Sequence, residues 1–396
     1  MSESEAGSVE VLRKSEHETI LDGARRIAPL IRDQAAAAEA ACRLTDPVVN
    51  ALRESGVFRM SMPRAWGGPE LEFVQQIEIV EVLAQADASA GWCAMICSDS
   101  GFYAAMLDDA PALSLYKNLD FVTAGLLLPV GRLETVNGGY RLSGRWSFGS
   151  GSSHADVFAA GALVTKDGAI VPDSNGQPQW RIALLPADQV QVHEGTWHTT
   201  GLSGSGSNDY SVDNVFVDHD YTFKLGETRR PETLYRWRGA YITNFVGVPL
   251  GVAAGALGSA TEALVDKVVD PAGALARDQP RAQAALGRAQ AMVGSARSYA
   301  YDIFGQLWST LDRGDEPTYA LRAAIAGCLV HTTAACLDAV RLLVETVGTA
   351  GIRRGSPLER NLRDLITIRQ HILGQDKMAE WAGALQFGKS VDFPIL

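Results

Sequence analysis

The sequence has no excess of basic charge, no hydrophobic leader and no unbroken apolar run long enough to cross a membrane. Its 35 Lys and Arg stand against 46 Asp and Glu, a formal net charge of −11 over 396 residues, so a surface that neutralises nucleic-acid phosphates is not expected. The first residues are polar and acidic, unlike a signal peptide. The longest apolar stretches, such as Val246 to Ala256, contain glycines and fall short of the about 20 residues that span a bilayer. We therefore expect a cytoplasmic protein that binds neither nucleic acid nor membrane.

Cysteine is also scarce. The chain has five cysteines, an odd number, without a CxxC motif or a His-rich cluster, a pattern that favours a reducing compartment. Cys93 and Cys97 stand one helical turn apart, which is also the spacing of a metal-binding pair. Two small buried hydrophobic residues on one helix face are the better interpretation. We assign no metal site.

Apolar residues are plentiful. They make up 46% of the chain, enough for large cores, and the length is typical of two or three domains. Helical periodicity and helix-end signals fill residues 1–120 and predict an N-terminal helical domain. The expected helices run from Val9 to about Cys42, from a cap at Thr45 to a stop at Gly56, from Glu72 to Ala84 and from Ser89 to about Leu107.

The pattern changes near residue 121. Short apolar or alternating runs between Gly, Pro, Asn and Asp predict a β domain over residues 121–225. Its expected strands run from Phe121 to Leu128, Gly139 to Phe148, Asp156 to Val164, Trp180 to Leu185 and Tyr210 to Val217. Apolar-periodic segments near 240–270, 279–312, 317–350 and 357–386 then predict a C-terminal four-helix bundle over residues 226–396. This α+β order makes the domain interfaces the natural place for a large cofactor.

Two loops of small residues stand out in the β domain. Residues 144–156 read GRWSFGSGSSHAD, and residues 197–208 read WHTTGLSGSGSN. Such runs let backbone N–H groups and serine hydroxyls approach a polar heterocycle closely. Neither loop matches the phosphate-binding GxxxxGK[ST] pattern or the strand-to-helix dinucleotide fingerprint. Taken singly, each is more often an ordinary β-turn.

Together with ETVGTAG at residues 345–351 and PLERNLRD at residues 357–364, these loops resemble the acyl-CoA dehydrogenase family in its broad sense, in the same order, from about residue 20 to residue 388. The resemblance implies an acyl-CoA dehydrogenase-like fold with a β-barrel-like central domain, and a homotetramer. It also implies a flavin site. The residues that it places there are Trp146, Ser147, Ser150, Gly151, Trp197, Gly201, Ser205, Gly206, Ser207 and Gly348.

One residue of the dehydrogenases is missing. They remove an α-proton from a thioester with a glutamate, but the aligned position here is Ile372, and the position used by a minority of them falls on Tyr241. His371 stands one residue before the missing glutamate. In this respect the chain resembles the oxygenase components of two-component flavin monooxygenases, which have a histidine at the corresponding place. A lone histidine in a helical segment is more often structural, but this coincidence favours a functional one.

The resemblance to these oxygenases implies a reaction. Reduced flavin, FADH2 in preference to FMNH2, would come by diffusion from a separate NAD(P)H:flavin reductase and form a C4a-hydroperoxide with O2, which hydroxylates an electron-rich small molecule. Ser150 is the expected donor to the flavin or peroxide. His371 is the expected proton carrier, since an intrinsic pKa of about 6.5 suits transfer near neutrality.

The substrate is expected to be aromatic, such as an indole, a phenol or a polycyclic compound, with oxidation at nitrogen or sulfur left open. These oxygenases often hold a histidine for phenols where this chain has Ser100. An acyl-CoA dehydrogenase and an inactive flavin-binding scaffold remain as alternatives. The expected pocket residues are Trp92, Ser98, Ser100, Tyr241 and Phe245.

Overall fold

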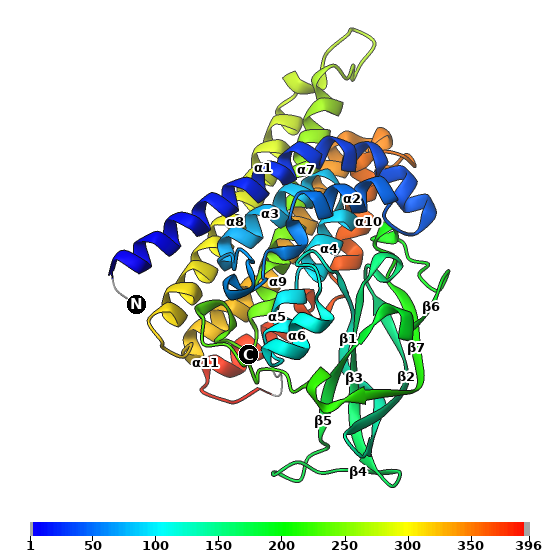
Figure 1. Cartoon of the computed structure of the whole chain (residues 1–396). Helices are drawn as coiled ribbons and strands as arrows, with labels where there is room; N and C mark the ends of the chain where they lie inside the picture. The colour runs from blue at the N-terminus through cyan, green and yellow to red at the C-terminus, as the bar shows by residue number, and fades with distance from the viewer. Residues whose placement is uncertain (1–2, 392–396) are drawn as a thin grey trace.

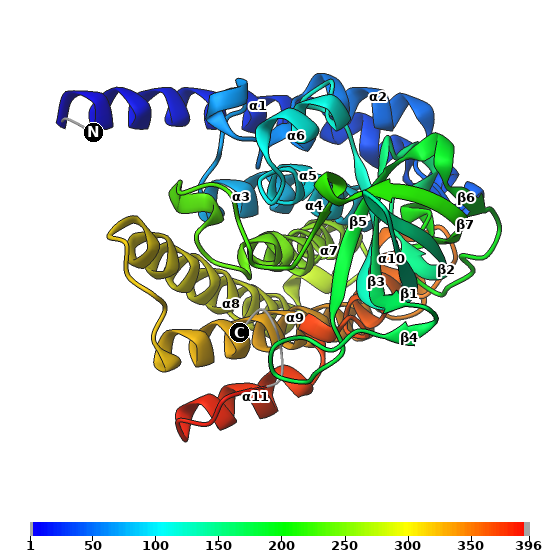
Figure 2. The ribbon, with the colours of Figure 1, turned by 60° about the horizontal axis from the view of Figure 1, so that its bottom comes forward.

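The structure is a computed structural model that describes residues 3–391, with side chains from residue 15 onward. Helices from both ends of the chain form one body beside a β-sheet (Figure 1). In the turned view, the sheet lies at one end of this body and the first helix runs along its outer edge (Figure 2). The predicted order of helical, β and helical regions is confirmed.

The N-terminal region begins with the predicted long helix. Its helices are α1 (Glu3–Ala41), α2 (Asp46–Glu54), α3 (Phe73–Ala86), α4 (Ala88–Cys97), α5 (Ser100–Ala104) and α6 (Asp109–Leu115). Thr45 does occupy the N-cap of α2, but its side chain makes no capping hydrogen bond, so that part of the prediction is wrong. The Thr45 carbonyl accepts the first hydrogen bond of the helix, from the Val49 amide at 3.0 Å.

The single helix predicted from Ser89 to Leu107 is two helices. The chain turns between α4 and α5, where the hydroxyl of Ser98 donates to the Met95 carbonyl at 2.9 Å. Ser100 Oγ contacts the Cys97 carbonyl at 3.0 Å. Serine hydroxyls that bind nearby backbone in this way compete with helical hydrogen bonds, and apolar periodicity does not register that competition.

The central region is one mixed sheet of eight strands. They are β1 (Thr123–Val136), β2 (Gly139–Gly149), β3 (Val157–Lys166), β4 (Ala169–Ile170), β5 (Trp180–Pro186), β6 (Gln191–His193), β7 (Asn208–Asp218) and β8 (Thr222–Phe223). The order is β6-β7-β2-β1-β3-β5-β8, with β4 on β3, and β1 and β3 run parallel. All five predicted strands are present. The three that were not predicted have two or three residues each, too short for a periodic pattern.

The C-terminal region is built around α9 (Tyr319–Val347), which packs against four other helices of this region. These are α7 (Gly247–Val265), α8 (Pro280–Asp312), α10 (Pro357–Ile368) and α11 (Lys377–Gln386). The 3-10 helix η8 (Ala240–Val246) leads directly into α7. Two stretches, Ala240–Val265 and Tyr319–Ala350, are long and apolar enough to cross a membrane, but 78% and 61% of their apolar windows is buried inside the protein, as in core helices.

The helical segment predicted for residues 357–386 is broken between α10 and α11. The short 3-10 helix η11 (Ile372–Gly374) occupies the break, and His371 is its N-cap. The Gly374 amide donates to the His371 carbonyl at 2.8 Å, and Arg369 donates to the Gly374 carbonyl. His371 therefore lies at a turn between helices and not within one.

The two helical regions share a single hydrophobic core. Three glycines of α7 at spacing four face the backbone of α3: an added Cβ would lie 2.8, 2.2 and 2.6 Å from the Ile77, Glu81 and Gln85 carbonyl oxygens, respectively. The small residues thus let α3 and α7 pack backbone to backbone. The glycines are Gly247, Gly251 and Gly255.

Candidate active site

Trp92 on α4 contacts residues from each of the other two regions. Its Nε1 donates a hydrogen bond to Ser150 Oγ at 3.0 Å. Its ring lies edge-on to His371, with centroids 5.4 Å apart, and edge-on to Phe245 at 6.2 Å. Phe245 in turn stacks on His371 at 5.5 Å. Four residues singled out in the sequence are therefore neighbours: Trp92, Ser150, Phe245 and His371.

Ser150 belongs to a chain of hydroxyl groups with a defined direction. Ser150 Oγ lies 2.8 Å from Ser207 Oγ, and Ser207 Oγ lies 2.7 Å from Ser205 Oγ. Ser205 donates its only hydroxyl proton to the Leu202 carbonyl at 2.7 Å, so Ser207 has to donate to Ser205. Ser150 then donates to Ser207. The hydroxyl of Ser150 accepts from Trp92 and its proton points into the protein.

His371 is half-buried and neutral. Desolvation by burial lowers its pKa to about 4, below the intrinsic value of about 6.5. Its Nδ1 accepts a hydrogen bond from the Leu373 amide at 3.4 Å. From this bond we assign the ring proton to Nε2. Among residues 15–391, Nε2 has no hydrogen-bond partner in the protein, which leaves an N–H donor beside Trp92.

The loop of residues 197–208 is fixed to α10. The Leu202 amide donates to Asp364 Oδ1 at 2.7 Å, and Arg363 donates to the Thr200 carbonyl. Gly201 lies so close to α10 that an added Cβ would be 2.2 Å from the Arg363 carbonyl oxygen. Only glycine fits there without moving the loop.

The two small-residue loops also contact each other and α4. The Gly151 amide donates to the Ser205 carbonyl at 2.9 Å. Gly151 has φ +76°, and a Cβ added there would lie 2.7 Å from Cys97 Sγ. Cys93 Sγ lies 3.5 Å from the Ser205 carbonyl oxygen. Both cysteines are fully buried, so their role is to pack against the loops. Gly206, at φ +57°, completes the turn.

An exposed aromatic pair lies at the end of β2. Phe148 is 61% exposed and has φ +65°, a conformation that is rare for a bulky residue. It lies edge-on to Trp197 at 6.3 Å. Trp197 is anchored through Nε1 to the Leu202 carbonyl at 2.9 Å. Sequence reasoning did not single out Phe148, and no local pattern distinguishes it from a core residue.

Two residues of the expected flavin set lie elsewhere. Trp146 is fully buried in the sheet core, stacked on Tyr210 at 5.3 Å and bound through Nε1 to the Gly161 carbonyl. Gly348 follows α9 next to Lys267, beyond the far end of α7. Since α7 has 19 residues, that end is about 28 Å from the end where Phe245 lies. Trp146 and Gly348 are therefore not part of the cluster around Trp92.

The expected pocket serines make their hydrogen bonds inside the protein. Ser98 Oγ binds the Met95 carbonyl. Ser100 Oγ contacts the Phe121 carbonyl at 2.8 Å and accepts from the Thr123 amide at 3.0 Å. The Ser98 hydroxyl thus bonds within the end of α4, and the Ser100 hydroxyl ties the start of α5 to the segment that leads into β1. Ser98 and Ser100 are fully buried, whereas Tyr241, which is also expected to line the pocket, is half-buried.

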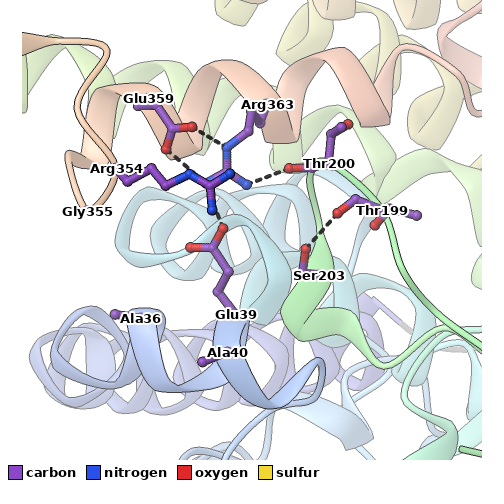
Figure 3. Close-up of a pocket in the computed structure, with 10 residues that line it drawn as sticks. All are labelled: Ala36, Glu39, Ala40, Thr199, Thr200, Ser203, Arg354, Gly355, Glu359 and Arg363. Atoms are coloured by element: carbon purple, nitrogen blue, oxygen red, sulfur yellow. Dashed lines mark hydrogen bonds and ion pairs between the residues drawn. The ribbon is translucent and has the colours of Figure 1, made fainter. Parts of the chain in front are cut away.

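A cavity of about 530 Å³ lies between α1, α10 and the loop of residues 197–208. Figure 3 shows the guanidinium of Arg363 in this cavity between Glu39 and Glu359. Each carboxylate lies 2.6 Å from a guanidinium nitrogen. These charges pair with one another, and Arg363 also holds the loop of residues 197–208 through the Thr200 carbonyl. No residue of the cluster around Trp92 is among those that line this cavity, so the cavity is a different place.

Comparison with known families supports the same fold. Residues 14–109 match the family "Acyl-CoA dehydrogenase, N-terminal domain", and residues 244–376 match "Acyl-CoA dehydrogenase, C-terminal domain". The indole-3-acetate monooxygenase of Pseudomonas putida is 32% identical to this chain over 94% of this chain and 93% of its own length. The oxygenase subunit HsaA of a flavin-dependent monooxygenase from Rhodococcus jostii is 27% identical over 89% and 93%.

A solved structure has the same architecture. XiaF from a Streptomyces species, in complex with FADH2 and glycerol, superimposes with a TM-score of 0.89 at 21% identity and covers 99% of this chain and 100% of its own. At this identity the superposition establishes the fold.

Proposed function

This chain belongs to the flavin-dependent monooxygenases of the acyl-CoA dehydrogenase family, and we propose that its substrate is an electron-rich aromatic molecule of the indole class. It is an oxidoreductase that acts with O2 and reduced flavin, the oxygenase component of a two-component system. The observation that carries the proposal is that Ser150 and His371, from different regions, contact the same indole ring of Trp92. The substrate class is supported by the similarity to an indole-3-acetate monooxygenase.

The residues near the β2 end fit a flat heterocycle. Phe148 and Trp197 offer aromatic surface at an angle to each other, and aromatic rings pack favourably in stacked or edge-on arrangements. The backbone of Phe148 is held in a conformation that costs energy, as is common where a ligand is bound. Ser147, half-buried, directly precedes Phe148 in the chain. We propose that this surface and the two small-residue loops hold the flavin ring.

We propose that two residues of this site, Ser150 and His371, donate hydrogen bonds to the reacting oxygen. Reduced flavin, when bound, would supply the electrons that activate O2, and one oxygen atom of O2 would go to the substrate. The Ser150 hydroxyl would rotate so that it donates to that oxygen and no longer to Ser207. It would still accept the hydrogen bond from Trp92 Nε1. His371 would donate from Nε2 as a neutral imidazole. Trp92 contacts both residues and Phe245 stacks on His371, and exclusion of water from this site would strengthen such hydrogen bonds.

The dehydrogenase alternative lacks a base. Ile372, at the position of the missing glutamate, is 37% exposed and apolar. Tyr241, at the other position, is a phenol whose pKa is raised by burial, so it stays protonated near neutral pH. Neither residue removes a proton from a thioester.

We further propose FADH2 in preference to FMNH2, supplied by a separate NAD(P)H:flavin reductase. The choice of FADH2 is supported by XiaF, which is solved in complex with FADH2. The reductase partner is supported by the HsaA relative, which is named as the oxygenase subunit of its monooxygenase. In the absence of a dinucleotide motif in the sequence, reduction by a separate protein is the simpler arrangement. We place the protein in the cytoplasm.

We propose a homotetramer in which neighbouring subunits complete each site. Gly348 lies about 28 Å along α7 from the cluster around Trp92 of its own chain. If Gly348 contacts a flavin, it would therefore be the flavin of a neighbouring subunit. Val265, Val268 and Val269 near it are exposed on one chain, and such apolar surface favours an interface. Residues 1–120, 121–225 and 226–396 would act as three domains around the site. Light scattering tests this, and a stable, active monomer would contradict it.

The function is tested by anaerobic titration with reduced and oxidised FAD and FMN, followed by oxygen and an indole-type substrate. We expect tighter binding of the reduced form and a hydroxylated product for each flavin oxidised. Tighter binding of oxidised flavin, with bleaching by an acyl-CoA, would support the dehydrogenase alternative. Tight flavin binding with no product from any aromatic substrate would support an inactive scaffold.

A further inference from the structure

Leu202, in the loop of residues 197–208, has a backbone conformation that bulky residues rarely adopt. Its φ is +53°, in the left-handed region where a side chain crowds its own backbone. The residue is buried, at 3% exposure. Such a conformation costs energy and persists only where the surroundings enforce it. The hydrogen bonds of the Leu202 backbone therefore identify what fixes this loop.

The Leu202 carbonyl is a common acceptor for two side chains of the proposed site. It accepts from Trp197 Nε1 at 2.9 Å and from Ser205 Oγ at 2.7 Å. The Ser205 amide donates to the same oxygen at 3.0 Å. Trp197 belongs to the surface proposed for the flavin ring, and Ser205 lies in contact with Ser207. The positions of both side chains therefore depend on the direction in which this carbonyl points.

The Leu202 amide donates to a buried side chain of α10, Asp364. Asp364 Oδ1 accepts this bond at 2.7 Å, and the residue is 3% exposed. Burial, followed by the charge of Asp87, raises the pKa of Asp364 to about 7, so an acid is unfavourable at this position. Without the acceptor, the buried amide would be unpaired. A rotation that finds it another partner would also redirect the Leu202 carbonyl, because both groups belong to one residue.

The other contacts of α10 with this loop act on the residues before Leu202. Arg363 donates to the Thr200 carbonyl (Figure 3), and Gly201 packs against the Arg363 carbonyl oxygen. These contacts set the distance of the loop from α10. They do not involve the amide or the carbonyl of Leu202, so the orientation of that residue depends on Asp364.

We propose that Asp364 is a positioning residue of the flavin site: its Oδ1 fixes the Leu202 backbone, and the Leu202 carbonyl in turn holds Trp197 against the flavin ring. The same carbonyl keeps Ser205 in contact with Ser207. The inference deepens the function proposed above and rests on it. Asp364 acts through Leu202 and does not itself touch the flavin. Only the acceptor is required, so a neutral amide at position 364 serves as well as the acid.

Asp364→Asn and Asp364→Leu separate this role from the loss of a charge, because both side chains are neutral and only Asn has an acceptor. We expect anaerobic titration of the full-length protein with reduced FAD to give a dissociation constant about 10- to 100-fold higher for Asp364→Leu, since a buried amide loses its partner. Asp364→Asn should stay within a few-fold of the wild type. With O2 and an indole-type substrate, product formed per flavin oxidised should fall in Asp364→Leu, because the ring is displaced together with Trp197. It should be kept in Asp364→Asn.

Thr165→Val is the matched control for a loss of stability. It removes a buried hydroxyl that donates to Glu134 at 2.6 Å, near the C-terminal end of β3. Its thermal midpoint should fall while flavin binding and the product ratio stay unchanged. Wild-type binding of reduced FAD by Asp364→Leu overturns the proposal, as does equally weak binding by both Asp364 variants.

Hydrogen exchange of the wild type decides the matter even where Asp364→Leu fails to fold. Reduced FAD should slow the exchange of amides in the loop of residues 197–208, because a ligand that needs this arrangement stabilises it. An unchanged exchange rate in this loop overturns the proposal. If flavin binding follows Asp364 but no aromatic compound is hydroxylated, the positioning role stands and the function proposed above fails.

Discussion

The indole nitrogen of Trp92 donates to Ser150 Oγ at 3.0 Å, and this bond joins α4 to the loop that follows β2. Because the bond occupies a lone pair of Ser150, the hydroxyl proton is the part of this residue left to act on a ligand. That proton is directed at Ser207 in the structure. A donor role for Ser150 therefore requires only a rotation about its C–O bond.

Ser150→Ala and Ser207→Ala should differ in function and agree in stability. Each leaves a buried hydrogen-bonding group unpaired, so each should lower the free energy of unfolding by about 1 to 3 kcal/mol. Ser150→Ala removes the donor and should lower product formed per flavin oxidised. Ser207→Ala only releases the Ser150 proton and should keep that ratio. Product and hydrogen peroxide are measured side by side, and an equal loss in both variants would count against Ser150 as the donor.

His371→Ala should leave flavin binding within a few-fold and reduce hydroxylation by roughly 10²-fold, the range for a lost proton-handling group. His371→Gln, which keeps an N–H donor, should retain part of the activity. Because burial lowers the His371 pKa to about 4, titration of this residue should not change the wild-type rate between pH 6 and 8. If instead His371→Ala lowers only the thermal midpoint while the coupling ratio is unchanged, His371 is structural.

Regular periodicity was enough to predict the long helices and the five main strands, because their burial repeats along the chain. The outward position of Phe148 was not predictable. Trp146 and Phe148 are two apart and would share a face of a regular strand, but the pairing of β2 with β7 shifts between Trp146 and Gly149. This irregularity accompanies the φ of +65° at Phe148, so one ring is buried and the other exposed.

The candidate site was predictable only where a motif marked it. His371 and Ser150 were found because they lie in segments that resemble a known family, and their contact through Trp92 needed the fold.

Asp364→Asn should change the pH dependence of stability. Burial raises the Asp364 pKa to about 7 from 3.8, with the charge of Asp87 as the next cause. The folded chain then binds more protons than the unfolded chain between these values, so stability falls as the pH rises through them. The amide keeps an acceptor for the Leu202 amide and carries no charge.

We therefore expect Asp364→Asn to melt at a higher temperature than the wild type above pH 7 and at a similar temperature near pH 4. Thermal melts across this range, with the exposed Asp338→Asn as the control, measure the difference. An offset of the same size at every pH would show that the charge of Asp364 is not the cause.

Gly201→Ala should displace the loop of residues 197–208 from α10. The new Cβ would lie 2.2 Å from the Arg363 carbonyl oxygen, a contact that a helix backbone cannot relieve cheaply, so the loop has to move. The movement would strain the bond from the Leu202 amide to Asp364 and, through Ser205 and Ser207, the support of Ser150. We expect weaker binding of reduced flavin together with a loss of about 1 to 3 kcal/mol in the free energy of unfolding.

Gly258→Ala is the matched control, because Gly258 lies in α7 with open space around its Cβ position. Alanine there should raise stability by up to about 1 kcal/mol and leave flavin binding unchanged. Flavin binding that is equal in the two variants would mean that the loop does not form part of the flavin site.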